Sequence, residues 1–219
     1  MQEKPTYNAD YFIQGILQKD RIIFSKAITL IESTKPNDEA TAEAIIEACL
    51  QTQKTSKRIA ITGSPGAGKS TFINAFGKQL LDNNNSVAVL AIDPSSSISK
   101  GSILGDKTRM EDLISHPKCY IRPTASSSTL GGVARKTRET IILCEAFGFD
   151  YILVETVGVG QSETLVKNMT DLFLLLLLPN AGDELQGIKR GIMEMADIIL
   201  INKSEKENEV IAKISATQV

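Results

Sequence analysis

The chain contains 219 residues, of which 42% are hydrophobic and 23% are charged, proportions that are ordinary for a globular protein. Its formal net charge of −2 argues against a strongly basic nucleic-acid binder and gives no attraction to an anionic membrane surface. The cysteines Cys49, Cys119 and Cys144 form no CxxC pair, so we expect no disulfide framework, no zinc or nickel site, and a reducing compartment.

Residues 1–55 are predicted to form a small helical region ahead of the main domain. Apolar residues recur there at helical spacing, first at Tyr11, Phe12 and Ile16, and then at Ile23, Ala27 and Leu30. Pro36-Asn37-Asp38 predicts a break and an N-cap, followed by a third helix with acidic residues in its first turn. This region either only packs on the main domain or docks a partner. The N-terminus shows neither the apolar core of a secretory signal nor a transit peptide.

Residues 56–219 alternate short β-branched or leucine-rich runs with helical segments. This alternation predicts an α/β fold with a mainly parallel sheet and helices on both faces. The expected strands are Arg58–Thr62, Val87–Ile92, Tyr120–Arg122, Tyr151–Glu155, Leu172–Leu178 and Ile198–Ile201. The apolar run Leu172–Leu178 is far shorter than the about 20 residues that a membrane helix needs, so it predicts a buried strand.

The strongest motif is G-x-x-x-x-G-K-[ST], the P-loop, which follows the first expected strand and opens a helix. Its residues are Gly63, Ser64, Pro65, Gly66, Ala67, Gly68, Lys69 and Ser70, with Thr71 next. The glycines allow several backbone N–H groups to converge on phosphate oxygens at a helix N-terminus. Lys69 supplies a cation for the β- and γ-phosphates, and Ser70 supplies a hydroxyl oxygen for Mg²⁺. The motif predicts a nucleoside-triphosphate site in a P-loop NTPase.

A second motif, Glu155-Thr156-Val157-Gly158, lies at the end of the fourth expected strand. An acidic residue at that place is a candidate ligand of Mg²⁺, directly or through water. Gly158 is a candidate for a backbone N–H donor to the γ-phosphate, and Val159–Glu163 for a mobile switch segment.

A third group of candidates follows the second expected strand. Asp93 and Asp106 are candidate metal ligands. Lys107 and Arg109 either compensate phosphate charge or form a solvated loop face, and the residues alone leave both alternatives open. His116, the only histidine, is expected in a loop or cap rather than as a catalytic base.

The fourth motif, Asn202-Lys203-Ser204-Glu205, directly follows the last expected strand. GTPases have N-K-x-D here, because a carboxylate can accept two N–H donors from the edge of guanine. Glu205 is one methylene longer than that aspartate, so the bidentate contact requires a carboxylate that is set back. Guanine preference is the resulting prediction, with Asn202, Lys203 and Glu205 as the base-binding residues.

Together these segments resemble the MeaB/ArgK family, P-loop GTPases that act as chaperones for adenosylcobalamin-dependent methylmalonyl-CoA mutase. The resemblance runs from Ala9 to the end of the chain and is carried by GSPGAGKST, AIDPSSS, GSILGDKTRM, TLGGVARKTRE, VETVGVGQSE, GDELQGIKRG and NKSE. NKSE departs from the usual NKAD-type motif. Some relatives bear the older label of an arginine/ornithine transport kinase.

The resemblance implies roles that spacing alone does not assign. Asp183, Gln186 and Lys189 lie in a loop that behaves as an additional switch toward the mutase in the family. Without the resemblance, this charged segment reads as the start of a helix. The resemblance also implies that Asp93, Asp106 and Glu155 serve Mg²⁺ and the switches.

In the same comparison Arg109 belongs to the first switch, and we expect it to assist Lys69 and Glu155 in catalysis. Family members normally continue through a helical C-terminal part that forms a homodimer. We therefore expect a chain that lacks this dimerisation region, with weak or absent dimerisation. A cytoplasmic location is expected, or the mitochondrial matrix for a eukaryotic relative.

The leading hypothesis is a slow GTPase, with GTP/GDP and Mg²⁺ as cofactors, whose hydrolysis gates cofactor loading or rescue of the mutase. No general base is apparent, which favours low intrinsic turnover that the partner raises. One alternative is a kinase that phosphorylates an arginine/ornithine transport protein. Another is a nucleotide-binding scaffold without useful hydrolysis. Neither nucleic acid nor a membrane is an expected partner.

Overall fold

The computed structural model describes residues 7–52, 54–92, 110–124, 130–156, 162–179, 190–205 and 208–218. The strands are β1 (Lys57–Gly63), β2 (Val87–Ile92), β3 (Cys119–Thr124), β4 (Tyr151–Thr156), β5 (Leu172–Leu177) and β6 (Ile198–Ile201). The helices are α1 (Ala9–Leu17), α2 (Arg21–Ile31), α3 (Pro36–Leu50), α4 (Lys69–Asp82), α6 (Glu111–Ile114), α7 (Leu130–Phe147), α8 (Ser162–Lys167), α10 (Arg190–Met195) and α11 (Glu209–Gln218).

The strands form one sheet in the order β3-β2-β4-β1-β5-β6, and every pairing is parallel. This confirms the predicted α/β class, and each expected strand lies within a residue or two of an observed one. The apolar sequence explains the arrangement, because strands such as β2 (VAVLAI) are buried along their whole length. β1 pairs with both β4 and β5, so its C-terminal end has a strand on each side.

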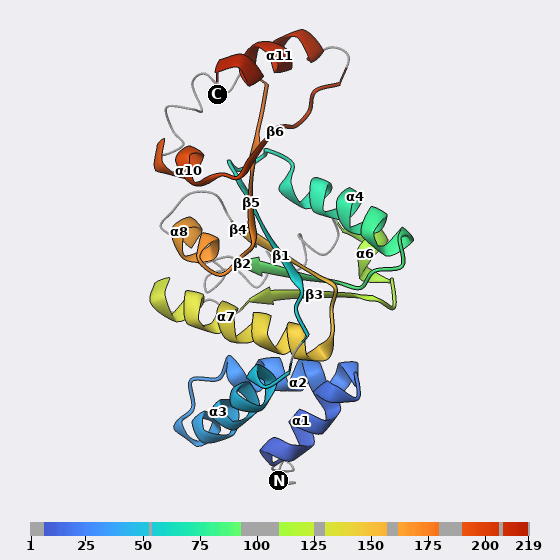
Figure 1. Cartoon of the computed structure of the whole chain (residues 1–219), viewed down its shortest axis with the longest axis vertical. Coiled ribbons are helices and arrows are strands. Elements are labelled where there is room, and N and C mark those ends of the chain that lie inside the picture. The colour runs from blue at the N-terminus through green and yellow to red at the C-terminus, as the bar shows by residue number, and fades with distance from the viewer. Residues whose placement is uncertain are drawn as a thin grey trace, which may run out of the picture.

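Helices cover both faces of the sheet, as predicted (Figure 1). On one face, α4 and α6 bury residues such as Ile73 and Leu113 against the sheet. On the other face, α7 contributes Leu143 and Phe147 to a larger core that also includes residues of α1, α2 and α3. The N-terminal helices pack mainly on α7, which lies between them and the sheet in Figure 1, and α2 also contacts β3 directly.

The N-terminal helices begin at side chains that accept backbone hydrogen bonds. The side chain of Asn8 accepts from Tyr11 N, and that of Asp20 accepts from the amides of Ile22 and Ile23. The predicted N-cap at Pro36-Asn37-Asp38 is wrong. The helix begins at Pro36 itself, after Lys35, which makes no side-chain cap bond. The ring of a proline at N1 fixes φ near the helical value and removes an N–H that would lack a partner, so no polar cap is needed.

An aromatic cluster joins the helical region to the main domain. The ring of Phe24 is fully buried, and its centroid lies 4.4 Å from that of Phe147, 4.9 Å from that of Tyr120 and 5.9 Å from that of Phe149. A partly buried ion pair between Glu32 and Arg122 lies on the same boundary. Packing on the main domain is thus an observed property of this region, and partner docking stays a prediction.

Each cysteine side chain is a buried free thiol. Burial raises the pKa of Cys49 to about 11 and that of Cys119 to about 12, and it raises the pKa of Cys144 still further. Because a thiolate rather than a thiol is the nucleophile, these residues contribute to packing and not to chemistry. Among the described helices, none is long and apolar enough to cross a membrane.

Truncation of the central ring of the aromatic cluster tests this packing. We expect Phe24→Ala to lower the free energy of unfolding by about 3–5 kcal/mol, because it removes a ring enclosed by three others. The matched control is Ile22→Ala in the same helix, at a side chain that is 70% exposed, and its change should stay within about 0.5 kcal/mol. Urea unfolding followed by circular dichroism measures both. Equal effects of the two substitutions would show that the helical region is not part of the core.

Candidate nucleotide site

The candidate site lies at the edge of the sheet where its parallel strands end. β1 ends at Gly63 and runs into the P-loop, β4 ends at Thr156, and β6 ends at Ile201 just before Asn202. Ligands of open parallel sheets bind beyond the carboxyl ends of the strands. The fold therefore brings three of the motifs found in the sequence to one edge.

Two glycines of the P-loop lie where a larger residue would be strained and would meet a neighbouring atom. Gly68, the N-cap of α4, has φ +87°, and a Cβ there would lie 2.5 Å from Asn202 Nδ2. Gly63 has φ +150°, and a Cβ there would lie 2.4 Å from the carbonyl oxygen of Leu176. The loop consequently passes directly against the end of β5 and against the fourth motif. Its residues lead into α4, whose first-turn N–H groups form an anion-binding helix N-terminus.

The side chain of Lys69 folds back across the loop that it terminates. Its Nζ donates hydrogen bonds to the carbonyl oxygens of Gly63 at 2.7 Å and Ser64 at 3.0 Å. These two carbonyl oxygens fix the position of the ammonium group. A positive charge held over converging backbone N–H groups is suited to a polyphosphate.

Ser70 and Glu155 meet behind the P-loop. Ser70 Oγ donates to Glu155 Oε1 at 3.0 Å, and both side chains are buried. Next to them, Thr156 Oγ1 donates to Thr62 Oγ1 at 2.8 Å, which ties the ends of β4 and β1 together. A hydroxyl and a carboxylate are oxygen ligands of the kind that Mg²⁺ prefers, so this pair fits the ion.

The described residues offer no cluster of side chains that could hold a metal ion without other ligands. No group of three or more His, Cys, Asp or Glu side chains that could hold a metal occurs among them. Mg²⁺ in nucleotide sites takes one or two protein ligands and completes its shell with phosphate oxygens and water. The Ser70–Glu155 pair is consistent with that mode rather than with an all-protein cage.

The fourth motif is joined to the P-loop by a side chain. Asn202 Nδ2 donates to the carbonyl of Ala67 at 2.7 Å, and Asn202 N donates to that of Leu177 at 2.7 Å. Lys203 adopts a left-handed backbone conformation with φ +54°. It is held by Asn208 Nδ2, which donates to its carbonyl at 3.1 Å. Glu205 follows with an exposed side chain.

Several predicted site residues lie outside the described residues. They are Asp93, Asp106, Arg109, Gly158, Asp183, Gln186 and Lys189. The structure brings Lys69, Ser70, Glu155 and Asn202 together, along with the P-loop backbone. Sequence reasoning missed the Thr62–Thr156 hydrogen bond, for which two threonines at the ends of neighbouring expected strands were the available signal.

Comparison with known proteins agrees with this geometry. The sequence model of one family, Methylmalonyl Co-A mutase-associated GTPase MeaB, matches residues 24–219. The chain belongs to the MeaB family. GTPase ArgK of Escherichia coli is 47% identical over 203 residues, which are 93% of this chain and 61% of that protein. A protein named as a probable GTPase in Mycobacterium bovis is 52% identical over 200 residues, 91% of this chain and 60% of that protein.

A eukaryotic relative is similar to a comparable degree. The mouse methylmalonic aciduria type A homolog, described as mitochondrial, is 47% identical over 223 residues, 97% of this chain and 54% of that protein. This MeaB-family chain thus spans about three fifths or less of the length of each of these relatives.

Solved structures confirm the fold. A structure described as an LAO/AO transport system kinase superposes with a TM-score of 0.80 at 37% identity, covering 97% of this chain and 63% of that chain. FtsY from Mycoplasma mycoides, at 14% identity and a TM-score of 0.53, shares the fold alone.

Substitution of the glycine at the start of α4 tests the contact between the P-loop and the fourth motif. We expect Gly68→Ala to weaken binding of Mg²⁺-GDP by about tenfold or more, because a left-handed alanine costs about 1–3 kcal/mol and its Cβ displaces the Asn202 amide. The control is Gly131→Ala in α7, where a Cβ would meet nothing within 4 Å. Isothermal titration calorimetry measures both variants. Unchanged affinity of Gly68→Ala would contradict the described loop geometry.

Proposed function

We propose that this chain binds GTP with Mg²⁺ and hydrolyses it to GDP and phosphate at the P-loop edge of the sheet. The observation that carries the proposal is the convergence of Lys69, Ser70, Glu155 and Asn202 around one loop in a chain of the MeaB family. The names of the E. coli and M. bovis relatives, both GTPases, support it.

Each group at the site has a separate role in the proposed hydrolysis. Backbone N–H groups of the loop and of the first turn of α4 hold the phosphates, and Lys69 places its charge beside the β- and γ-phosphates. Ser70 and Glu155 would hold Mg²⁺, which neutralises charge on the phosphate oxygens when bound. Water attacks the γ-phosphate in line with the bond that breaks, and these groups stabilise the charge that develops.

Slow turnover by the isolated chain is part of the proposal. The described residues near the loop include no histidine, since His116 lies in the turn before β3, where its Nδ1 accepts from Lys118 N at 3.2 Å. A group that a partner supplies to such a site can raise the rate by about 10³–10⁵-fold. Regulation by a partner is therefore included in the proposal.

The proposed partner is an adenosylcobalamin-dependent mutase of the methylmalonyl-CoA type. Two names support it, the family description as mutase-associated and the mouse relative's name after methylmalonic aciduria. In this proposal the nucleotide state of the chain gates cofactor loading or rescue of the mutase. The cytoplasm is the proposed location, in keeping with three buried free thiols.

The first test replaces the lysine that folds over the loop. We expect Lys69→Ala to lower kcat/KM for GTP by about 10²–10³-fold, the loss typical when one electrostatic donor is removed from a transition state. Lys78→Ala in the same helix is the control, since Lys78 pairs with Asp112 at 3.8 Å and should leave kcat/KM unchanged. Phosphate release from GTP and ATP, with and without added mutase, measures the rates.

The same assay separates the proposal from its alternatives. With γ-labelled GTP, a GTPase releases labelled free phosphate, whereas a kinase of a transport protein, the activity for which the solved relative is named, labels protein. A rapid rate that ignores the mutase would contradict gating. Absence of any release would leave a nucleotide-binding scaffold in place of an enzyme.

The second test concerns the base. We expect Glu205→Gln to weaken GDP binding by about 10–100-fold while ADP binding stays the same, because charged hydrogen bonds to the guanine edge are each worth about 1.5–3 kcal/mol. Glu209→Gln is the control, since that carboxylate accepts from Lys213 at 2.8 Å and both side chains are exposed on α11. Titration calorimetry with both nucleotides gives the ratio. An unchanged GDP-to-ADP ratio would remove Glu205 from base recognition.

A further inference from the structure

A second charged cavity lies at the opposite edge of the sheet. Its volume is about 420 Å³, which is within the range of small-molecule sites. The described side chains that line it include four cations, Lys19, Arg21, Lys54 and Lys118, and one carboxylate, Asp150. We call this cavity the basic crevice. Its positive charge is local, because the chain as a whole has a formal net charge of −2.

The crevice is built from turns that precede strands and from the junction of α1 and α2, which supplies Lys19 and Arg21. Lys118 directly precedes β3, and Asp150 directly precedes β4, so both lie at the amino ends of their strands. The P-loop follows the carboxyl end of β1. Since strands of this length extend roughly 20 Å, the crevice is a separate site and not an extension of the nucleotide site.

The cations of the crevice are held in place by neutral oxygens. Arg21 donates from both terminal nitrogens to the carbonyls of Pro117 and Cys119. Lys118 Nζ donates to the carbonyl of Asn84 at 3.2 Å. Carbonyl acceptors fix these groups without neutralising them, so the positive potential of the crevice persists.

Lys54 is bound in the same way. Its Nζ donates to the carbonyl of Gly148, and its distance to Asp150 Oδ1 is 3.9 Å, at the limit of an ion pair. Asp150 is already engaged, because its Oδ2 accepts from Ser86 N at 2.8 Å and from Ser86 Oγ at 2.7 Å. The single carboxylate therefore offsets only part of the charge around it.

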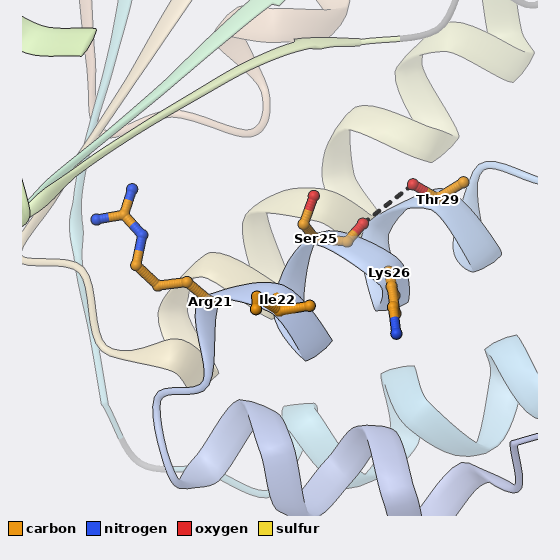
Figure 2. Close-up of a pocket in the computed structure, with 5 residues that line it drawn as sticks. All are labelled: Arg21, Ile22, Ser25, Lys26 and Thr29. Atoms are coloured by element: carbon orange, nitrogen blue, oxygen red, sulfur yellow. Dashed lines mark hydrogen bonds between the residues drawn. The ribbon is translucent and has the colours of Figure 1, made fainter. Parts of the chain in front are cut away.

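Several other cations in the described part of the chain have carboxylate partners close to them. The guanidinium or ammonium groups of Arg58, Arg122, Arg135, Lys167 and Lys213 each have a carboxylate as an ion-pair partner. Figure 2 shows that the Arg21 side chain points in a different direction from that of Lys26, although both residues line a groove on α2. The crevice thus concentrates cations for which the fold supplies few anions.

Two residues that line the crevice have a left-handed backbone conformation. Lys19 and Asn84 have φ values of +62° and +66°, and they are two of the three non-glycine residues with positive φ in the described chain. Each of them follows the end of a helix, Lys19 after α1 and Asn84 after α4, where the left-handed conformation is common. They end α1 and α4 at the same cavity, which both residues line.

We propose that the basic crevice binds a compact phosphate-bearing anion, such as a pyrophosphate or phosphate-ester group of a small molecule. An ion with several negative charges matches several cations around one carboxylate, and a guanidinium with ammonium groups is a recurrent phosphate-binding set. The volume admits such a group together with a small remainder. This site is independent of the GTP site proposed above.

Inorganic pyrophosphate and inorganic phosphate are the probes. Because the P-loop also binds phosphates in the proposed function, the titrations use the full chain with Lys69→Ala, which weakens that site. We expect pyrophosphate to bind this variant, with phosphate weaker. The further pair Lys19→Gln and Lys118→Gln should raise Kd by about tenfold or more. The matched control is the pair Lys78→Gln and Lys213→Gln, which removes the same charge from residues with carboxylate partners and should leave Kd unchanged.

Three results would overturn the proposal. They are loss of all pyrophosphate binding on Lys69→Ala alone, equal weakening by the control pair, and no measurable binding to begin with. If the crevice variants do not fold, the Lys69→Ala chain alone tests the proposal. NMR spectra then record which backbone amide chemical shifts change when pyrophosphate is added. Shifts at Lys19, Lys54 and Lys118 support the crevice, and shifts confined to residues 63–71 refute it.

Discussion

The pairing of β1 between β4 and β5 is the constraint on which the nucleotide site depends. Ile61 is opposite Glu155 on one side, and Gly63 is opposite Leu176 on the other. A shift of one residue would turn every side chain to the other face of the sheet and move Glu155 away from Ser70. The apolar residues that bury β1 on both faces therefore also determine the distance between a hydroxyl and a carboxylate at its end.

Local signals predicted most of the fold. Unbroken apolar runs identified the strands, and P-loop spacing located the loop, because each is a property of neighbouring residues. The start of α3 differs from the prediction, because residue type alone does not show which residue is the cap. Asn37 and Asp38 are common cap residues, but a proline at N1 begins a helix without one. The side chain of Glu205 is exposed in the structure. Its binding to the nucleotide base therefore stays a prediction.

Contacts between distant segments could not be read from the sequence. Asn202 belongs to a motif associated with the base, yet its side chain braces Ala67, 135 residues earlier. The ion pair of Arg122 with Glu32 spans 90 residues. The cations of the basic crevice come from separate turns and form no motif at all. Such pairs arise only when the sheet order is known, because each depends on which strand ends lie side by side.

The boundary between the helical region and the main domain contains polar contacts as well as apolar ones. Burial alone lowers the pKa of Arg122, but its hydrogen bond and charge interaction with Glu32 raise the pKa above its ordinary value. Removing either partner would leave a buried charge uncompensated, which is costlier than losing an exposed pair. Nearby, Lys136 of α7 donates to the carbonyl of Ile31 at the end of α2. Movement of α2 against α7 therefore has to break polar contacts as well as separate rings.

The two edges of the sheet are alike in how they orient cations. At the carboxyl edge, Lys69 is held by carbonyls of its own loop, while Glu155 is buried against Ser70. At the amino edge, Arg21, Lys54 and Lys118 are held by carbonyls of neighbouring turns. β2 and β4 span both edges, so ligands at the two sites can influence each other only if the sheet has two states that bind them unequally. β2 is buried at every residue, and such continuous packing opposes a second arrangement of the sheet. We therefore expect binding at one site to leave the affinity of the other site unchanged, unless the turns themselves move.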